Sequence, residues 1–186
     1  MTMTEKEKLR RGLPHNPGKD PELLGERQYA KDMCYEYNQL HPRKMEDRRA
    51  VLKLLLGGIK GDILIEQPFY CDYGYNIKVG DNFYANHNCI MLDPAEITFG
   101  DNVYIGPNCG FYTAEHPLDV EQRRQDLETA RPIRVGNDVW LGGNVVVLPG
   151  VTIGDNVVIG AGSVVTRDIP PNSVAYGNPC RVKNKT

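Results

Sequence analysis

The chain has 186 residues, of which 40% are hydrophobic and 25% are charged, and its formal net charge is -2 at pH 7. This balance excludes a disordered acidic tail and a strongly basic nucleic-acid binder, and the length suits one domain with a small attachment. The N-terminus has no signal-peptide pattern and no apolar stretch reaches the span of a bilayer. We therefore expect a cytoplasmic protein that binds neither membrane nor nucleic acid.

Residues 1–60 are expected to form a helical N-terminal cap. Apolar residues recur at helical spacing over residues 23–40 and again over residues 45–59. Asp20 followed by Pro21 is typical of a helix N-cap with proline at the first helical position. The pattern predicts two helices joined by a short link.

From about residue 61 the period of the apolar residues changes to six. In the clearest part of this series, a branched or large apolar residue stands at Val135, Leu141, Val147, Ile153, Ile159 and Val165. A second apolar or small residue follows four positions after each one. Neither helices nor alternating strands repeat in sixes, so two inward positions in six indicate a short strand followed by a corner. Residues 61–186 are expected to form stacked coils around an apolar interior.

Glycine, aspartate and asparagine mark the expected corners. A Gly-Asp-Asn triplet or its permutation begins at each of Gly80, Gly100, Gly136 and Gly154, at offsets of 20, 36 and 18 residues. Glycine tolerates a positive φ, and asparagine and aspartate tolerate the left-handed region, as a repeated sharp corner requires. Three hexads, or eighteen residues, make one coil. The two extra residues in the first offset are expected to widen one corner.

The sixfold series is interrupted over residues 112–134, which carry many charges. A long loop is expected to leave the coil here, and loops of more than about 12 to 15 residues in a compact domain tend to be functional. Because a coil is stabilised by stacking on its neighbours, both ends of the stack need covers. The helices are expected to cover one end, and residues 168–172 the other.

Beyond the repeat, several segments are similar to a known family. They cover residues 70–76, 82–86, 113–117, 137–142, 149–154 and 177–181. These segments resemble the maltose and galactoside O-acetyltransferases of the hexapeptide-repeat acyltransferase superfamily. The resemblance covers nearly the whole chain, and its most specific elements are His116-Pro117 and the later Trp140-x-Gly142.

The resemblance implies a mainly β fold, a left-handed parallel β-helix with an N-terminal helical cap. It also implies a homotrimer with acetyl-CoA and a sugar bound in clefts between subunits. The residues alone predict only stacked coils with flat, partly apolar faces, which could pair between chains but need not.

Acetyl transfer from a thioester to an alcohol requires a base and a group that stabilises the oxyanion. Histidine changes its protonation near neutral pH, and His116 lies at the start of the loop, so the resemblance implies that it is the general base. The alternative is a histidine that only satisfies loop carbonyls. The resemblance assigns the oxyanion contact to a small residue's amide, here Gly143, which a coil corner could also require.

The resemblance also implies an acceptor site for a sugar. Asn86 and Asp93 match acceptor-contacting positions, and Asp72 matches a third where the maltose-like branch carries Asp and the galactoside branch Ser. This favours glucose or maltose as acceptor, with the 6-OH as the expected nucleophile. Arg27 and Asp20 match helical residues that reach the sugar, although Asp20 could serve only as the N-cap.

Two further residues belong to the expected acceptor cleft. Tyr84 could lie against a sugar ring, whereas aromatic residues on coil surfaces more often serve packing. Glu128 is near a cleft position of the family, and a solvated charge is the alternative explanation.

For acetyl-CoA, the co-substrate, the resemblance implies a groove lined by the only tryptophan, Trp140. A lone tryptophan in a coil could instead lie in the core or a subunit interface. The remaining expected contacts are Ala161, Thr166, Arg167 and Arg181. Asn184 stands where the family has a second arginine, and flanking Lys183 or Lys185 could replace its charge.

A metal site is not expected. Only His87 and His116 lie in the coils, so a three-histidine zinc site lacks a ligand. The five cysteines include no Cys-x-x-Cys pair, and Cys89 and Cys109 fall at inward positions as small buried hydrophobes. The alternatives to a maltose-type enzyme are transfer to a galactoside or a nodulation-type oligosaccharide, or a non-catalytic scaffold.

Overall fold

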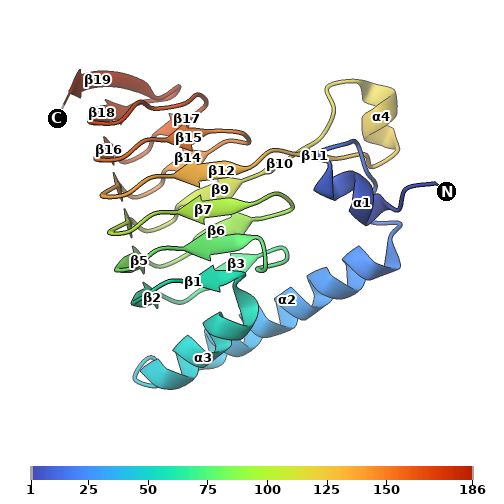
Figure 1. Ribbon diagram of the computed structural model, residues 1–186, viewed down its shortest axis with the longest axis horizontal. Coiled ribbons are helices and arrows are strands. Elements are labelled where there is room, and N and C mark those ends of the chain that lie inside the picture. The colour runs from blue at the N-terminus through green and yellow to red at the C-terminus, as the bar shows by residue number, and fades with distance from the viewer. Residues whose placement is uncertain (1, 186) are drawn as a thin grey trace.

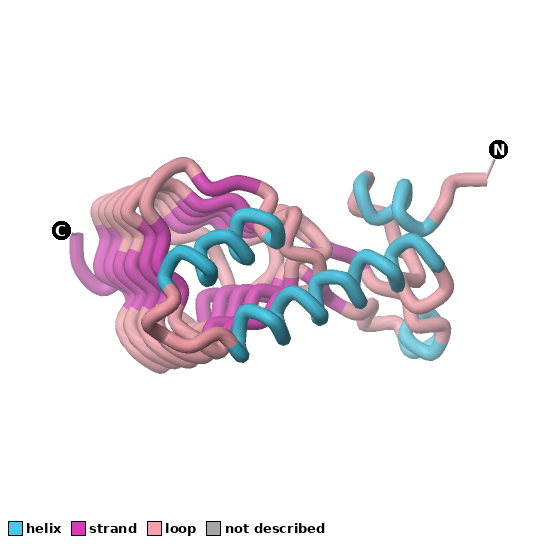
Figure 2. The backbone as a smooth tube through the Cα atoms, turned by 90° about the horizontal axis from the view of Figure 1, so that it is seen from below, coloured by secondary structure: helices cyan, strands magenta, loops and turns pink. Residues whose placement is uncertain are grey.

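Short strands stack into three sheets, parallel except for the last strand of the chain, which form the sides of a triangular β-helix in the computed structural model (Figures 1 and 2). The structure describes residues 2–185. Sheet A contains, in chain order, β2 (Ile63–Ile65), β5 (Phe83–Ala85), β8 (Tyr104–Ile105), β13 (Trp140–Leu141), β16 (Val157–Ile159), β18 (Ser173–Tyr176) and β19 (Arg181–Lys185). Sheet B contains β3 (Phe69–Cys71), β6 (Cys89–Leu92), β9 (Gly110–Tyr112), β14 (Val146–Val147) and β17 (Val164–Val165). Sheet C contains β1 (Gly58–Ile59), β4 (Ile77–Val79), β7 (Ile97–Phe99), β12 (Ile133–Val135) and β15 (Thr152–Ile153).

The predicted sixfold series lines the interior of the β-helix. Its members Val135, Leu141, Val147, Ile153, Ile159 and Val165 are all buried. Cys89 and Cys109 are buried as expected. The chain passes from sheet A to sheet B to sheet C in each coil, so each hexad supplies one strand and one corner. The prediction of stacked coils is confirmed.

The corner between sheets C and A uses asparagine and glycine for different reasons. Asn82 and Asn102 have φ values of 52° and 57°, and the Asn82 Nδ2 donates to the Asn102 Oδ1 at 2.9 Å. Gly100 is not among the residues with positive φ. A Cβ there would lie 2.5 Å from the Asn137 Oδ1 and 2.7 Å from the Gly136 carbonyl carbon. The asparagine therefore makes the turn, and the glycine allows successive coils to approach closely.

The corner between sheets B and C is the widened one. The connections from β3 to β4 and from β6 to β7 carry the two additional residues that the offset of 20 predicts. At the next coil the same corner opens into the long loop, which contains β10 (Ala114–Glu115), α4 (Val120–Arg124) and β11 (Thr129–Ala130). Strands β10 and β11 pair antiparallel at the base of the loop.

Two of the helices cover the first coil, as predicted (Figure 1). Helices α2 (Pro21–Gln39) and α3 (Met45–Leu55) bury Tyr37 and Leu52 in the same apolar core as Phe69 of the first coil. A short additional helix, α1 (Glu5–Arg10), was not predicted; Thr4 and Glu7 form its capping box. None of the helices within residues 2–185 is both long and apolar enough to cross a membrane.

The opposite end of the β-helix differs from the expectation. Residues 168–172 do not form a separate cover, because Ile169 pairs with Ile153 and continues the last coil. The outermost element is β19, which folds back antiparallel on β18. This reversal satisfies the backbone of β18 on its outer side.

Candidate active site

A polar pocket of about 270 Å³ lies at the widened corner between sheets B and C. Its charged and titratable lining comes from α2, from the corner after β3, and from the loop: Arg27, Asp72, Glu115, His116 and Glu128, with Leu92 and Ala114 completing the wall. The fold thus brings together four residues for which the sequence suggested a role in the cleft, namely Arg27, Asp72, His116 and Glu128.

His116 presents one ring nitrogen to the backbone and the other toward the pocket. Its side chain is 51% exposed, and its Nδ1 lies 3.0 Å from the Leu127 carbonyl oxygen. A carbonyl only accepts, so in the neutral ring Nδ1 carries the proton and Nε2 carries the lone pair. The Glu128 Oε1 lies 3.8 Å from Nε2. This arrangement is suited to a general base.

Asp72 and Arg27 form the opposite side of the pocket. Burial raises the pKa of the Asp72 carboxyl, and the positive charge of Arg27 opposes this effect. The Arg27 Nη2 donates to the Tyr73 hydroxyl at 3.2 Å, and the guanidinium carbon lies 5.4 Å from the centre of the Tyr73 ring. The Arg27 Nε is buried without a partner among the residues described. The pair offers hydrogen-bond donors and acceptors to a polar ligand.

Asp93 lies beneath the pocket and has no exposed surface. Its Oδ1 accepts from the backbone N–H groups of Asp72 and Tyr73 at 3.0 and 2.8 Å, whereas its buried Oδ2 has no partner within the described chain. Burial is the main reason that its pKa is raised to about 7. In this structure Asp93 supports the segment that carries Asp72, and its predicted contact with an acceptor stays a prediction.

Asp20 is occupied as a helix cap. Its Oδ1 accepts from the N–H groups of Glu22 and Leu23, and its Oδ2 accepts from the Lys6 N–H. Asp20 is 8% exposed and does not line the pocket that contains His116. Of the two roles considered for this residue, the structure supports capping.

A second group of expected site residues lies on the outer face of sheet A. Tyr84, Asn86 and Trp140 line a shallow cavity of about 440 Å³ together with Tyr104. Tyr84 is in register with Tyr104, and Tyr104 with Trp140, so the three rings follow one another up the sheet. Trp140 is 57% exposed. It therefore belongs to the surface, which argues against the core alternative.

The two groups do not meet within one chain. The pocket with His116 lies at the corner between sheets B and C, and sheet A is the side of the triangle opposite that corner. Gly143 lies at the corner between sheets A and B, after β13 and before β14. A Cβ on Gly143 would lie 3.3 Å from Pro107, so the corner is tight. Sheet B therefore lies between Gly143 and the corner from which the loop with His116 leaves the coil.

The expected cofactor contacts are exposed but spread over the surface. Ala161 lies one coil above Gly142. The two are so close that a Cβ atom added to Gly142 would lie 2.7 Å from the Ala161 nitrogen. Thr166 and Arg167 follow β17 at the corner between sheets B and C. Arg181 begins β19, and the Lys183 Nζ in the same strand lies 5.3 Å from the Tyr176 ring centre. Asn184 pairs with Val174 at the end of sheet A.

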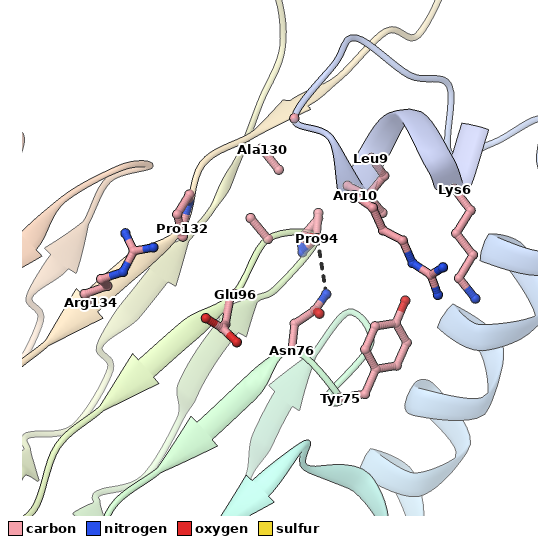
Figure 3. A pocket seen from close by; sticks show the side chains of 12 residues that line it. Lys6, Leu9, Arg10, Tyr75, Asn76, Pro94, Glu96, Ala130, Pro132 and Arg134 are labelled. Atoms are coloured by element: carbon pink, nitrogen blue, oxygen red, sulfur yellow. Dashed lines mark hydrogen bonds between the residues drawn. The ribbon is translucent and has the colours of Figure 1, made fainter. Parts of the chain in front are cut away.

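A separate cavity of about 330 Å³ lies between α1 and the base of the loop (Figure 3). Arg10 and Arg134 lie at opposite ends of it, and Lys6 is already paired with Glu22 and Glu26. None of the expected site residues lines this cavity. Its charged groups do not converge on one point.

No group of three or more metal-ligating side chains within residues 2–185 could hold a metal ion. His87 is exposed, and its Nδ1 lies 2.6 Å from the Gln67 carbonyl oxygen. The structure thus gives His87 a backbone partner and no further ligand.

Sequence reasoning missed the residues that support the loop. His15 and Asn16 are buried beside it, and the Asn16 Nδ2 donates to the Gln125 carbonyl at 2.6 Å. These partners are 109 residues apart and share no motif, so nothing in the sequence indicated the contact. Tyr104 was also missed, although the offset of 20 from Tyr84 placed both on one ladder.

Comparisons with known proteins agree with this architecture. Residues 132–167 match the model for bacterial transferase hexapeptide (six repeats), and residues 8–61 match the maltose acetyltransferase hexapeptide capping motif. The chain is 48% identical over 153 residues to galactoside O-acetyltransferase of Escherichia coli (strain K12), covering 82% of this chain and 75% of the relative.

Two solved structures are similar over almost the whole chain. A maltose O-acetyltransferase from Clostridium difficile 630 superposes with a TM-score of 0.97 at 50% identity, covering 100% of this chain and 98% of the other. A galactoside acetyltransferase in complex with coenzyme A superposes with a TM-score of 0.95 at 43% identity, covering 99% of this chain and 92% of the other.

Proposed function

Because the chain belongs to the maltose and galactoside O-acetyltransferase family of hexapeptide-repeat enzymes, we propose that it acetylates a sugar hydroxyl with His116 as the general base. The enzyme is an acetyl-CoA-dependent O-acetyltransferase. We propose the 6-OH of maltose, glucose or a related sugar as the acceptor group. The observation that carries the proposal is the contact of His116 Nδ1 with the Leu127 carbonyl, which leaves Nε2 to accept a proton in a pocket with Arg27 and Asp72.

The reaction requires one proton to leave the sugar hydroxyl as its oxygen attacks the thioester carbonyl. His116 Nε2 accepts this proton, with the Glu128 Oε1 lying 3.8 Å away. The hydroxyl oxygen forms the new ester bond, the carbon–sulfur bond breaks, and the proton passes to the coenzyme A thiolate. No covalent enzyme intermediate is required.

The pocket suits a neutral, hydroxyl-rich acceptor. Asp72 supplies acceptor oxygens and Arg27 supplies donors, so both could bind sugar hydroxyl groups without a charged ligand. Asn86 and Tyr84 are proposed as further contacts from a second copy of the chain, because they lie on sheet A. Asp93, whose Oδ2 has no partner within the described chain, is proposed as a further acceptor contact.

The outer faces of the β-helix support assembly into a trimer. The outward residues of sheet B are uncharged and mostly apolar: Tyr70, Ile90, Gly110, Val146 and Val164. Those of sheet A are also largely apolar: Leu64, Tyr84, Tyr104, Trp140, Val158 and Val174. Sheet C instead presents Lys78, Thr98, Arg134 and Thr152. Two different apolar faces suit a heterologous contact, which closes into a ring of three.

Such a ring would complete the active site. The sheet A residues of one copy would face the His116 pocket of the next, so that Gly143 and Trp140 could approach the reacting thioester. The Gly143 amide is proposed to stabilise the oxyanion. Trp140, Ala161, Thr166, Arg167 and Arg181 are proposed to bind acetyl-CoA, with the two arginines nearest its phosphates.

The proposal is tested by measuring coenzyme A release with a thiol reagent in the presence of maltose, glucose, a galactoside or no sugar. Sugar-dependent release of free thiol is expected, with glucose or maltose preferred. Preference for a galactoside would correct the acceptor. No release with any sugar, from protein that binds acetyl-CoA, would contradict the proposed sugar acetylation.

A further inference from the structure

We infer that Asn16 is a positioning residue for His116, acting through the loop segment 125–128. This inference rests on the proposed role of His116 as the base. The segment contains both groups that face the two ring nitrogens of His116: the Leu127 carbonyl oxygen at 3.0 Å from Nδ1 and the Glu128 carboxylate at 3.8 Å from Nε2. Whatever holds this segment also holds the imidazole.

Within the loop, the segment is joined to α4 by backbone bonds from the N–H groups of residues 125–127 to the carbonyls of Gln122 and Arg123. The preceding helix, α4, has no buried residue, and Asp126 adopts a positive φ of 55°. The β10–β11 pair connects the loop base at Glu115 and Thr129, just outside the segment. The tip of the loop therefore needs contacts from elsewhere to keep one geometry.

The N-terminal segment supplies these contacts at both ends of residues 125–128. The Asn16 Nδ2 donates to the Gln125 carbonyl at 2.6 Å. Next to it, the His15 N–H donates to the Glu128 carbonyl at 3.0 Å, and the Glu128 N–H donates to the His15 carbonyl at 2.8 Å. Two adjacent residues of the N-terminal segment thus bind the loop segment at its ends: Asn16 binds its first residue and His15 binds its last.

Asn16 is itself fixed before it reaches the loop. It is 6% exposed, its N–H donates to the Glu5 Oε2 at 2.6 Å, and its Oδ1 accepts from the Gly18 N–H at 3.1 Å. The Oδ1 bond fixes the orientation of the amide, so the Nδ2 must face the Gln125 carbonyl. Asn16 does not line the His116 pocket, so its effect would be indirect.

The substitution N16D separates these contacts. It retains the acceptor for Gly18 but replaces the donor with a carboxylate oxygen that faces the Gln125 carbonyl. We expect kcat to fall about tenfold while the KM for acetyl-CoA changes less than about threefold, because the base is misplaced and the cofactor groove is untouched. The matched control is N156D, which removes an amide donor to the Asn172 Oδ1 at the corner between sheets C and A. That variant should stay within about twofold of the parent in both constants.

A second readout does not depend on turnover. In protein labelled with nitrogen-15 histidine, the ring signals of His116, identified by their loss in H116Q, report which nitrogen carries the proton. We expect the Nδ1–H form to dominate in the parent chain and a mixture of both forms in N16D. If N16D does not fold, N16S removes the same bond without adding a charge.

Two results would overturn the inference. The first is a His116 tautomer that is unchanged in the Asn16 variant, and the second is a tautomer that changes to the same extent in N156D. A parent chain that transfers no acetyl group would refute the proposed function instead, and the ring signals would still decide whether Asn16 positions His116.

Discussion

The Nδ1 atom of His116 and the carbonyl oxygen of Leu127 are 3.0 Å apart, although His116 follows β10 on one arm of the protruding loop and Leu127 precedes β11 on the other. This contact assigns the proton of the neutral ring to Nδ1 and leaves Nε2 free to accept one. The loop is therefore part of the chemistry, because a carbonyl on its returning arm sets the tautomer of the histidine on its outgoing arm.

Replacing His116 by alanine removes the only proposed proton acceptor for the sugar hydroxyl. We expect kcat to fall by about 10² to 10⁴ with little change in the KM for acetyl-CoA, because general-base catalysis contributes about that factor. Initial rates of thiol release, together with direct measurement of acetyl-CoA binding, check this. A near-normal rate in this variant would remove His116 from the mechanism.

Replacing Arg181 by alanine should weaken cofactor binding more than catalysis. Arg181 is exposed at the start of β19, and Figure 1 shows β19 on the opposite side of the molecule from the loop helix α4. We expect the KM for acetyl-CoA to rise about tenfold with a smaller effect on kcat. Lys44→Ala is the matched control, because Lys44 is an exposed cation beside the helical cap, paired with Asp47. A lowered kcat at unchanged KM would contradict the assignment.

Replacing Asp93 by asparagine should change how stability depends on pH. The pKa of Asp93 is raised from 3.8 to about 7, so the folded state holds its proton more tightly than the unfolded state. The contribution of this carboxyl to the free energy of unfolding is complete below about pH 4, declines as the pH rises toward about 7, and no longer changes above that pH. Asparagine retains the Oδ1 acceptor for Asp72 and Tyr73 but does not ionise.

The difference in stability between D93N and the parent should therefore grow in favour of the variant between about pH 4 and 7. Denaturant midpoints measured across this range check the sign. A difference that is independent of pH would show that Asp93 ionises as easily in the folded chain as in the unfolded one.

A charge on the outer face of sheet B should prevent assembly. Val146 lies between Gly110 and Val164 on that face, so V146D would bury an unpaired carboxylate in the proposed subunit contact. We expect sedimentation to report three copies for the parent chain, single copies for V146D, and at least a 100-fold loss of activity. The control T98D introduces the same charge on sheet C, between Lys78 and Arg134, and should leave the trimer intact. A trimeric V146D would exclude sheet B from the interface.

Part of the candidate site could be predicted from the sequence because its residues stand in recognisable motifs. His116 and Asp72 occupy corner segments whose place in the coil follows from the period. The environments of Asp20 and Asp93 could not be predicted in this way. Asp20 is occupied by the N–H groups of Glu22, Leu23 and Lys6, and Asp93 is covered by the corner that carries Asp72. Burial depends on what packs above a residue, and a motif does not contain that information.

The sequence by itself determined the coil, because the sixfold repeat expresses local geometry: it assigns each inward residue to the interior of its own coil. It likewise determined that one corner of the first coils widens, since the offset of 20 counts residues between equivalent positions. Only the tertiary structure decided what surrounds His116. The groups that face His116 or hold its loop come from separate parts of the chain and include Asn16, Arg27 and Glu128. The distances between these parts depend on how the cap, the coil and the loop pack together.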